Sequence, residues 1–194
     1  MEIVEGNHPT LRQIALEVPV GKIKSRGIQK ILGDMKKALH AEDDGVAIAA
    51  PQIGVSQRIF VVSENVLEIK NRAGLQKLAS ETEKEKVKPK TSRYKDLIFI
   101  NPRIIKTSKD SSLMVEGCLS LRWLYGNVMR KKKATIEARN EKGEKFTRGA
   151  SGLLAQIFQH ETDHLDGILF IDKAKDVENI PPEKQRAHEK HNEK

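Results

Sequence analysis

Two histidines four residues apart, His160 and His164, stand in a segment whose apolar residues follow the spacing of a helix. Residues i and i+4 of a helix lie one turn apart on the same face, so both imidazoles can reach a single metal ion. Glu161 follows the first histidine and is placed to exchange a proton with a metal-bound water. The residues that bury the preceding turns are Leu153, Leu154, Ile157 and Phe158. The segment therefore predicts a metal-binding helix, and a solvated polar helix face is the alternative.

This helix can begin at Ser151, whose hydroxyl is a suitable cap, and end at Gly167 in the C′ position. A second, amphipathic helix is predicted nearer the N-terminus, over residues 27–40. Its apolar side chains recur at helical spacing with lysines between them, at Ile28, Ile31, Leu32, Met35 and Leu39. This pattern is typical of a helix that packs one face on a core.

Runs of β-branched and aromatic residues predict several strands. These strands cover residues 58–62, 97–100, 103–105, 133–138 and 144–147. Asn101 and Pro102 predict a turn between the second and third strands, and residues 140–143 predict the turn of a hairpin between the last two. The fold class is therefore α+β, with antiparallel strands packed around a central C-terminal helix that carries the histidine pair.

Two charged stretches stand apart from this pattern. Residues 64–95 alternate lysine with glutamate and lack long apolar runs, which predicts a solvated insertion with a short helix over 64–78. A docking arm is the functional alternative for this insertion. After Ile171 the chain again becomes charged, and we expect residues 173–194 to form a frayed or weakly helical tail.

The chain of 194 residues carries a formal net charge of +8. This charge favours an acidic partner, foremost nucleic acid, although scattered lysines and few aromatic residues fit a purely solubilising role equally well. The single cysteine excludes an internal disulfide. The first residues lack the pattern of a signal peptide, and no apolar run approaches the roughly 18 residues of a membrane span. We expect a cytoplasmic protein with no membrane partner, or one of an organellar matrix if a transit peptide has been removed.

Two histidines leave a metal ion short of protein ligands, so a third is expected. A downstream histidine of the metzincin kind is missing, because Phe170 stands at that position. The remaining histidines lie near the chain ends or at a helix terminus: His8, His40, His188 and His191. Cys118 is the stronger candidate, because it follows Gly117 in an extended segment and a thiolate binds divalent metals well. A small buried hydrophobe is the alternative for this cysteine.

Three motifs, taken in order, resemble those of the peptide deformylase family. Residues 45–52, G-V-A-I-A-A-P-Q, resemble the family's G-x-G-x-A-A-x-Q, residues 116–120 match E-G-C-L-S, and residues 159–164 match Q-H-E-x-D-H. A coarser resemblance runs from about residue 9 to residue 170. It implies a single deformylase-like catalytic domain over 1–172, with 64–95 as an insertion.

The resemblance implies removal of the formyl group from N-formylmethionyl nascent peptides. Cys118, His160 and His164 would hold one divalent metal ion, which in this family is natively Fe²⁺. Zn²⁺, Ni²⁺ or Co²⁺ would accept the same ligands. Glu161 would serve as general acid and base on the metal-bound water.

The resemblance also implies how the substrate is held. The Gln52 side-chain amide and the Leu119 backbone N–H would stabilise the oxyanion. The substrate-binding residues would be Gly45, Val46, Ala47, Leu153, Gln156 and Ile157. The ribosome, through its RNA and the basic surface of this chain, is a further candidate partner.

The chain departs from the family's pattern at three places. Ala47 replaces the second glycine of the first motif, and residues 121–125 replace a short proline-containing continuation of the second. Gln156 stands where an apolar residue commonly lines the methionine pocket, so its amide must find a partner there or be left unsatisfied when methionine enters. We therefore expect Gln156→Ile to improve hydrolysis of formyl-methionyl peptides. We further expect Arg130 to pair with Glu116, because members of the family carry an arginine at this distance after the cysteine and a carboxylate beside a thiolate needs a compensating charge. The alternative is that Arg130 only begins an exposed basic run over residues 130–133.

Two alternative functions remain at this point. A zincin-like peptidase would use the same helix to cleave longer peptides. A non-catalytic member that binds ribosomes or nascent chains would not need the intact ligand set and glutamate.

Overall fold

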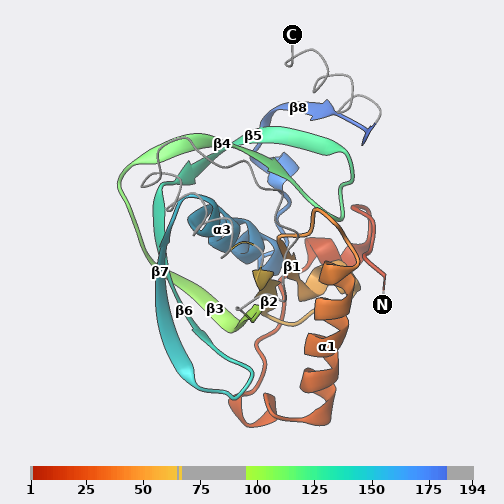
Figure 1. Ribbon diagram of the computed structural model, residues 1–194, viewed down its shortest axis with the longest axis vertical. Coiled ribbons are helices and arrows are strands. Elements are labelled where there is room, and N and C mark those ends of the chain that lie inside the picture. The colour runs from red at the N-terminus through yellow and green to blue at the C-terminus, as the bar shows by residue number, and fades with distance from the viewer. Residues whose placement is uncertain (1, 65, 67–94, 183–194) are drawn as a thin grey trace, which may run out of the picture.

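A computed structural model describes residues 2–64, 66 and 95–182 of the chain (Figure 1). Over these ranges the chain forms two antiparallel sheets and two α-helices. The larger sheet has the order β1–β2–β3–β6–β7, formed by Ala47–Ala49, Ile59–Val62, Leu97–Thr107, Lys133–Arg139 and Lys145–Ser151. The smaller sheet has the order β4–β5–β8, formed by Ser111–Gly117, Leu124–Lys131 and Lys175–Asn179. The helices are α1, Arg26–His40, and α3, Leu153–Leu165. This mixture of helices with antiparallel sheets agrees with the predicted class.

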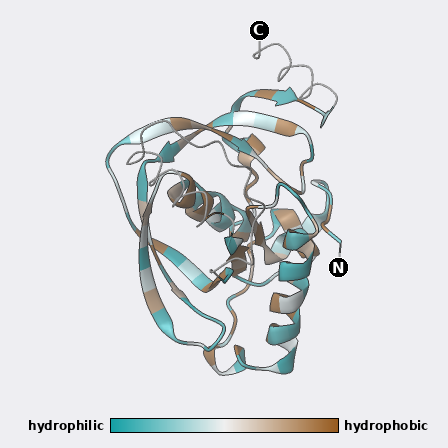
Figure 2. Ribbon diagram, in the orientation of Figure 1, coloured by the Kyte–Doolittle hydropathy of each residue, from teal (hydrophilic) through white to brown (hydrophobic). Residues whose placement is uncertain are grey.

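Helix α3 lies at the centre of the molecule and contacts strands of both sheets (Figure 1). Its Phe158 packs against Phe99, with ring centroids 5.2 Å apart, and Phe99 stacks on Phe60 at 4.5 Å. Hydrophobic colour in Figure 2 gathers around this helix and the strands behind it. Because Phe158 packs one face of α3 into this aromatic cluster, the other face of the helix remains available for polar chemistry.

Helix α1 covers the opposite face of the larger sheet. Its buried residues, Leu32, Met35, Ala38 and Leu39, join a second core with Ile59 and Val61 of β2. Phe60 and Val62 alternate with them and belong to the core around α3. Successive strand residues point to opposite faces, so β2 is apolar on both sides and the sheet lies between the two helices.

The end of α3 confirms the prediction for Gly167, but its start differs from the prediction for Ser151. Gly167 has φ +74°, and its N–H donates to the His164 carbonyl at 3.2 Å, which is typical of a C′ residue. Ser151 is still the last residue of β7, and the N-cap is Gly152 with φ +60° and no side-chain cap. The chain turns from strand to helix in one residue, and this requires a positive φ that glycine tolerates.

The predicted turn at Asn101 and Pro102 is wrong, because β3 runs through both residues. Its register against β6 shifts between Ile100 and Arg103, and Asn101 has φ +50°. The Asn101 side chain accepts from the Val18 N–H and donates to the Val18 carbonyl, both at 2.8 Å. Proline cannot donate to a ladder, so the strand forms a bulge rather than ending.

The hairpin of β6 and β7 confirms the turn predicted over 140–143.

The prediction of a frayed or weakly helical tail over 173–194 is wrong for the first part of that segment. There β8 pairs with β5, from Leu124↔Asn179 to Asn127↔Lys175. Every residue of β8 is exposed, so no apolar pattern marks the strand. Most of the predicted insertion, including its short helix, lies outside the described residues. Its first residue, Glu64, donates its backbone N–H to Asp96, the residue that follows the insertion, at 3.2 Å. No described helix is long and apolar enough to cross a membrane.

Candidate active site

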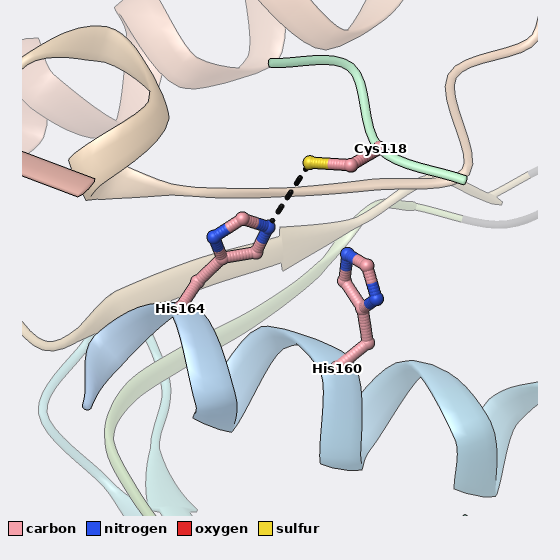
Figure 3. A group of neighbouring side chains, drawn as sticks. All are labelled: Cys118, His160 and His164. Atoms are coloured by element: carbon pink, nitrogen blue, oxygen red, sulfur yellow. Dashed lines mark hydrogen bonds between the residues drawn. The ribbon is translucent and has the colours of Figure 1, made fainter. Parts of the chain in front are cut away.

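The structure brings Cys118, His160 and His164 together, although the first histidine stands 42 positions after the cysteine in the sequence. One ligand atom from each lies within 4.8 Å of the others (Figure 3). Cys118 follows the end of β4, and both histidines project from one face of α3. The thiol sulfur is 3.3 Å from His164 Nε2. These are the distances at which three side chains can share one metal ion.

The electrostatics of these residues fit a cation. Burial alone would raise the pKa of Cys118, but the charges and hydrogen bonds of His164 and His160 outweigh it and lower the pKa to about 5. For His160 the burial effect has the opposite sign and would lower the pKa. Its hydrogen bonds to Cys118 and Glu116 outweigh burial and raise the pKa. The lowered pKa favours the thiolate form of Cys118, which is the form that binds a metal ion. Two imidazoles and a thiolate are ligands suited to Fe²⁺ or Zn²⁺.

Glu116 orients His160 and is itself held by Arg130. His160 Nδ1 lies 2.9 Å from Glu116 Oε2, so Nε2 is the ring nitrogen left for a metal. Arg130 donates from Nε to Oε1 at 2.7 Å and from Nη2 to Oε2 at 2.9 Å. Both side chains are 4% exposed or less, and this confirms the predicted pair. Burial would raise the pKa of Glu116, but Arg130 and His160 lower it to about 2.

The ion pairs continue beyond the predicted one. Arg130 Nη1 donates to Asp163 Oδ2 at 2.6 Å, and Lys173 Nζ donates to Asp163 Oδ1 at 2.7 Å. Sequence reasoning missed these contacts. Asp163 lies inside the third motif, but no local pattern indicates that its carboxylate faces Arg130 on β5.

Glu161 lies beside the candidate metal ligands with one oxygen unengaged. The residue is 4% exposed, and its Oε2 is buried without a hydrogen-bond partner in the described chain. Burial raises the pKa of its carboxyl. A buried carboxylate with a free oxygen and a raised pKa is suited to accept and return a proton.

Gln52 and Leu119, the two proposed oxyanion donors, both line the cavity beside Cys118. Gln52 Oε1 accepts from the Ala49 N–H at 2.8 Å, which turns Nε2 toward Cys118 Sγ and Ser120 Oγ, each at 3.5 Å. The Leu119 backbone N–H donates to no group in the described residues. Both residues line the cavity beside Cys118, and the two long Gln52 contacts can give way to an oxygen that binds there.

A cavity of about 310 Å³ opens above these groups. Its inner lining includes Gln52, Cys118, His160 and Glu161. Five of the six residues predicted to bind the substrate also line it: Val46, Ala47, Leu153, Gln156 and Ile157. Gly45 is not among the lining residues. It is buried where a Cβ would lie 2.6 Å from the Leu39 carbonyl, so only glycine allows this close approach to the end of α1.

Comparisons with known proteins agree with this geometry. A family profile described as "Polypeptide deformylase" matches residues 1–179. Peptide deformylase 2 of Clostridium acetobutylicum is 38% identical over 171 residues, covering 84% of this chain and 94% of that protein. The chain belongs to the peptide deformylase family. The chloroplastic/mitochondrial peptide deformylase 1A of Arabidopsis thaliana is 37% identical over 89% of this chain, which spans 60% of that longer relative.

Solved structures of deformylases share the fold. Peptide deformylase 1B of Arabidopsis thaliana, in complex with an inhibitor, superposes with a TM-score of 0.71 at 31% identity, covering 100% of this chain and 92% of that one. A Met-Ala-Ser-bound class I type b peptide deformylase from Acinetobacter baumannii gives a TM-score of 0.70 at 26% identity, covering 89% and 98%.

In this deformylase family member, the Gln156 amide has a partner, which is one of the two outcomes expected from the sequence. Its Nε2 donates to the Val115 carbonyl at 2.8 Å and lies 3.4 Å from Glu116 Oε1. β4 is an edge strand of its sheet, so the Val115 carbonyl is free to accept a bond from α3. The expectation that Gln156→Ile improves hydrolysis depended on an unsatisfied amide, and the bond to the Val115 carbonyl removes that reason.

Gln156→Ile is expected to destabilise the protein by about 0.5–1.5 kcal/mol, because the strand leading to Cys118 loses a hydrogen bond to α3. Urea unfolding monitored by circular dichroism measures the change. Gln156→Met, which keeps the length without the donor, should show the same loss. Unchanged stability together with faster hydrolysis of formyl-methionyl peptides would instead restore the original interpretation.

Proposed function

We propose that this chain hydrolyses the N-terminal formyl group of N-formylmethionyl nascent peptides with the aid of one divalent metal ion. The observation that supports this most directly is the convergence of three metal-binding side chains, a buried glutamate and two N–H donors on one cavity. The family supplies the substrate class, since its members are named for deformylation.

Cys118, His160 and His164 are the proposed ligands, with Fe²⁺ as the physiological metal. Zn²⁺, Ni²⁺ and Co²⁺ also suit this donor set. A metal ion bound there supplies a water activated at neutral pH and a Lewis acid for the formyl carbonyl.

Three groups of the chain then act on the substrate. Glu161 accepts a proton from the attacking water and delivers it to the departing amine nitrogen. Gln52 Nε2 and the Leu119 N–H donate to the formyl oxygen as negative charge develops on it. A donor of this kind contributes about 3 kcal/mol to stabilising the transition state.

The cavity gives the substrate its direction. The methionine side chain would lie against Leu153, Gln156 and Ile157 of α3, while the peptide backbone runs past Val46 and Ala47. The Acinetobacter baumannii relative, whose structure holds Met-Ala-Ser, is consistent with a product of this length.

The test is hydrolysis of formyl-Met-Ala-Ser after anaerobic reconstitution with each of the four metals, beside its acetylated and unblocked counterparts. We expect formate release from the formyl peptide alone. Cys118→Ser is expected to bind less metal, as measured by elemental analysis, and to lose this activity. Cleavage inside unblocked peptides would establish the zincin-like alternative, and failure with every metal would favour a non-catalytic, nascent-chain-binding protein.

We also propose that the protein works beside the ribosome, in the cytoplasm or an organellar matrix. The net charge of +8 supports contact with ribosomal RNA. Cosedimentation with ribosomes should therefore weaken steeply as salt rises, and binding that ignores salt would argue against RNA as the partner.

A further inference from the structure

Two segments of the chain that both line the cavity are tied together by one arginine. Arg122 Nη1 donates to both carboxylate oxygens of Asp44, at 3.0 and 2.9 Å, and Arg122 Nη2 contacts Glu42. Asp44 and Glu42 immediately precede the first motif, and Arg122 follows the second. The contact therefore joins the segment that precedes β1 to the loop that carries Leu119.

Arg122 and Asp44 line the exposed end of the cavity, and Glu42 adjoins them through its contact with Arg122. The side chains of Arg122, Asp44 and Glu42 are 31%, 57% and 35% exposed, whereas Gln52 and Glu161 are nearly fully buried. A peptide whose formyl group reaches Glu161 must leave the cavity toward solvent. The residues after its methionine then pass the exposed cluster.

Trp123 keeps the arginine in place. The Arg122 guanidinium lies 5.6 Å from the centre of the indole ring, within the range of a cation–π contact. Trp123 has φ +66°, a conformation that non-glycine residues rarely adopt, and its carbonyl accepts from the Ile180 N–H at 2.8 Å. Such a backbone persists only where surrounding contacts hold it, and it is frequent at ligand-binding sites.

The cluster carries two carboxylates and one guanidinium, so its net charge is −1 while the whole chain is +8. We propose that Arg122, Asp44 and Glu42 determine specificity for the residues after the formylated methionine, favouring basic over acidic side chains. This inference rests on the proposed deformylation. Because the charges are exposed, their effect is small at high salt and grows as salt is lowered.

The experiment compares kcat/KM for three C-terminally amidated peptides, formyl-Met-Lys-Ser, formyl-Met-Ala-Ser and formyl-Met-Asp-Ser, at about 20 and about 500 mM salt. The lysine peptide should exceed the aspartate peptide by roughly two- to fivefold at low salt, the ratio expected of exposed charge pairs. Arg122→Gln, which makes the cluster −2, should widen this ratio, and Asp44→Asn should narrow it.

Arg103→Gln is the matched control. It also removes one positive charge from an exposed ion pair, with Glu17 at 2.6 Å, but Arg103 does not line this cavity. Its lysine-to-aspartate ratio should equal that of the unaltered protein. Equal ratios in the unaltered protein, Arg122→Gln and Asp44→Asn, with all formyl peptides hydrolysed, would overturn the inference alone. Failure to hydrolyse any formyl peptide would overturn the proposed function.

Discussion

Replacing Glu161 with glutamine is expected to lower kcat by roughly 100- to 10,000-fold, the range that general acid–base catalysis contributes. The buried Oε2 has no partner among the described residues, so it is free to take a proton, and a neutral amide cannot. Cys118, His160 and His164 remain in place, so metal content should not change. Formate release from formyl-Met-Ala-Ser, together with elemental analysis of the same sample, measures both quantities.

Glu161→Asp sharpens this test because it keeps the carboxylate and withdraws it by one methylene. Partial activity in the aspartate variant, with near-complete loss in the glutamine variant, is the expected pattern. Near-normal turnover of a fully metal-loaded Glu161→Gln protein would remove this residue from the proposed mechanism.

Replacing Arg130 with methionine is expected to destabilise the folded protein by about 3–5 kcal/mol, the cost of leaving a buried partner unpaired. Arg130 holds both oxygens of Glu116 and one oxygen of Asp163, and all three side chains are largely buried. Urea denaturation of the metal-free protein measures the loss without a contribution from metal binding. Arg103→Met, which breaks an exposed pair, should cost at most about 1 kcal/mol. A loss of similar size in both variants would show that burial does not strengthen the Arg130 contacts.

The lowered pKa of Glu116 predicts that the folded protein loses stability at acidic pH. Glu116 binds its proton near pH 2 in the folded protein and near its ordinary pKa of 4.5 in the unfolded chain. Between these values the unfolded state takes up more protons, so the stability contributed by Glu116 is present above pH 4.5 and is lost as pH falls toward 2. The stability difference between the unaltered protein and Glu116→Gln should shrink over this window. A difference independent of pH would contradict the lowered pKa.

Local sequence patterns were sufficient for several parts of this protein. Helix α1 and the end of α3 at Gly167 follow from apolar spacing and from glycine's tolerance of positive φ. Placing His160 and His164 on one helix face needs only the periodicity of the helix. The pairing of Arg130 with Glu116 was predictable from a motif resemblance and from the charge that a carboxylate beside a thiolate requires.

Other features depend on contacts between segments far apart in the chain. The Gln156 amide finds its partner on β4, 41 residues away, and Arg122 meets Asp44 across 78 residues. The exposed strand β8 forms because β5 offers an open edge rather than because its own residues favour a strand. Periodicity and capping act over a few residues, so the sequence alone indicates which helix carries the candidate metal ligands. Which distant backbone or charge faces each side chain is set by how the sheets pack around α3, and no local pattern records it.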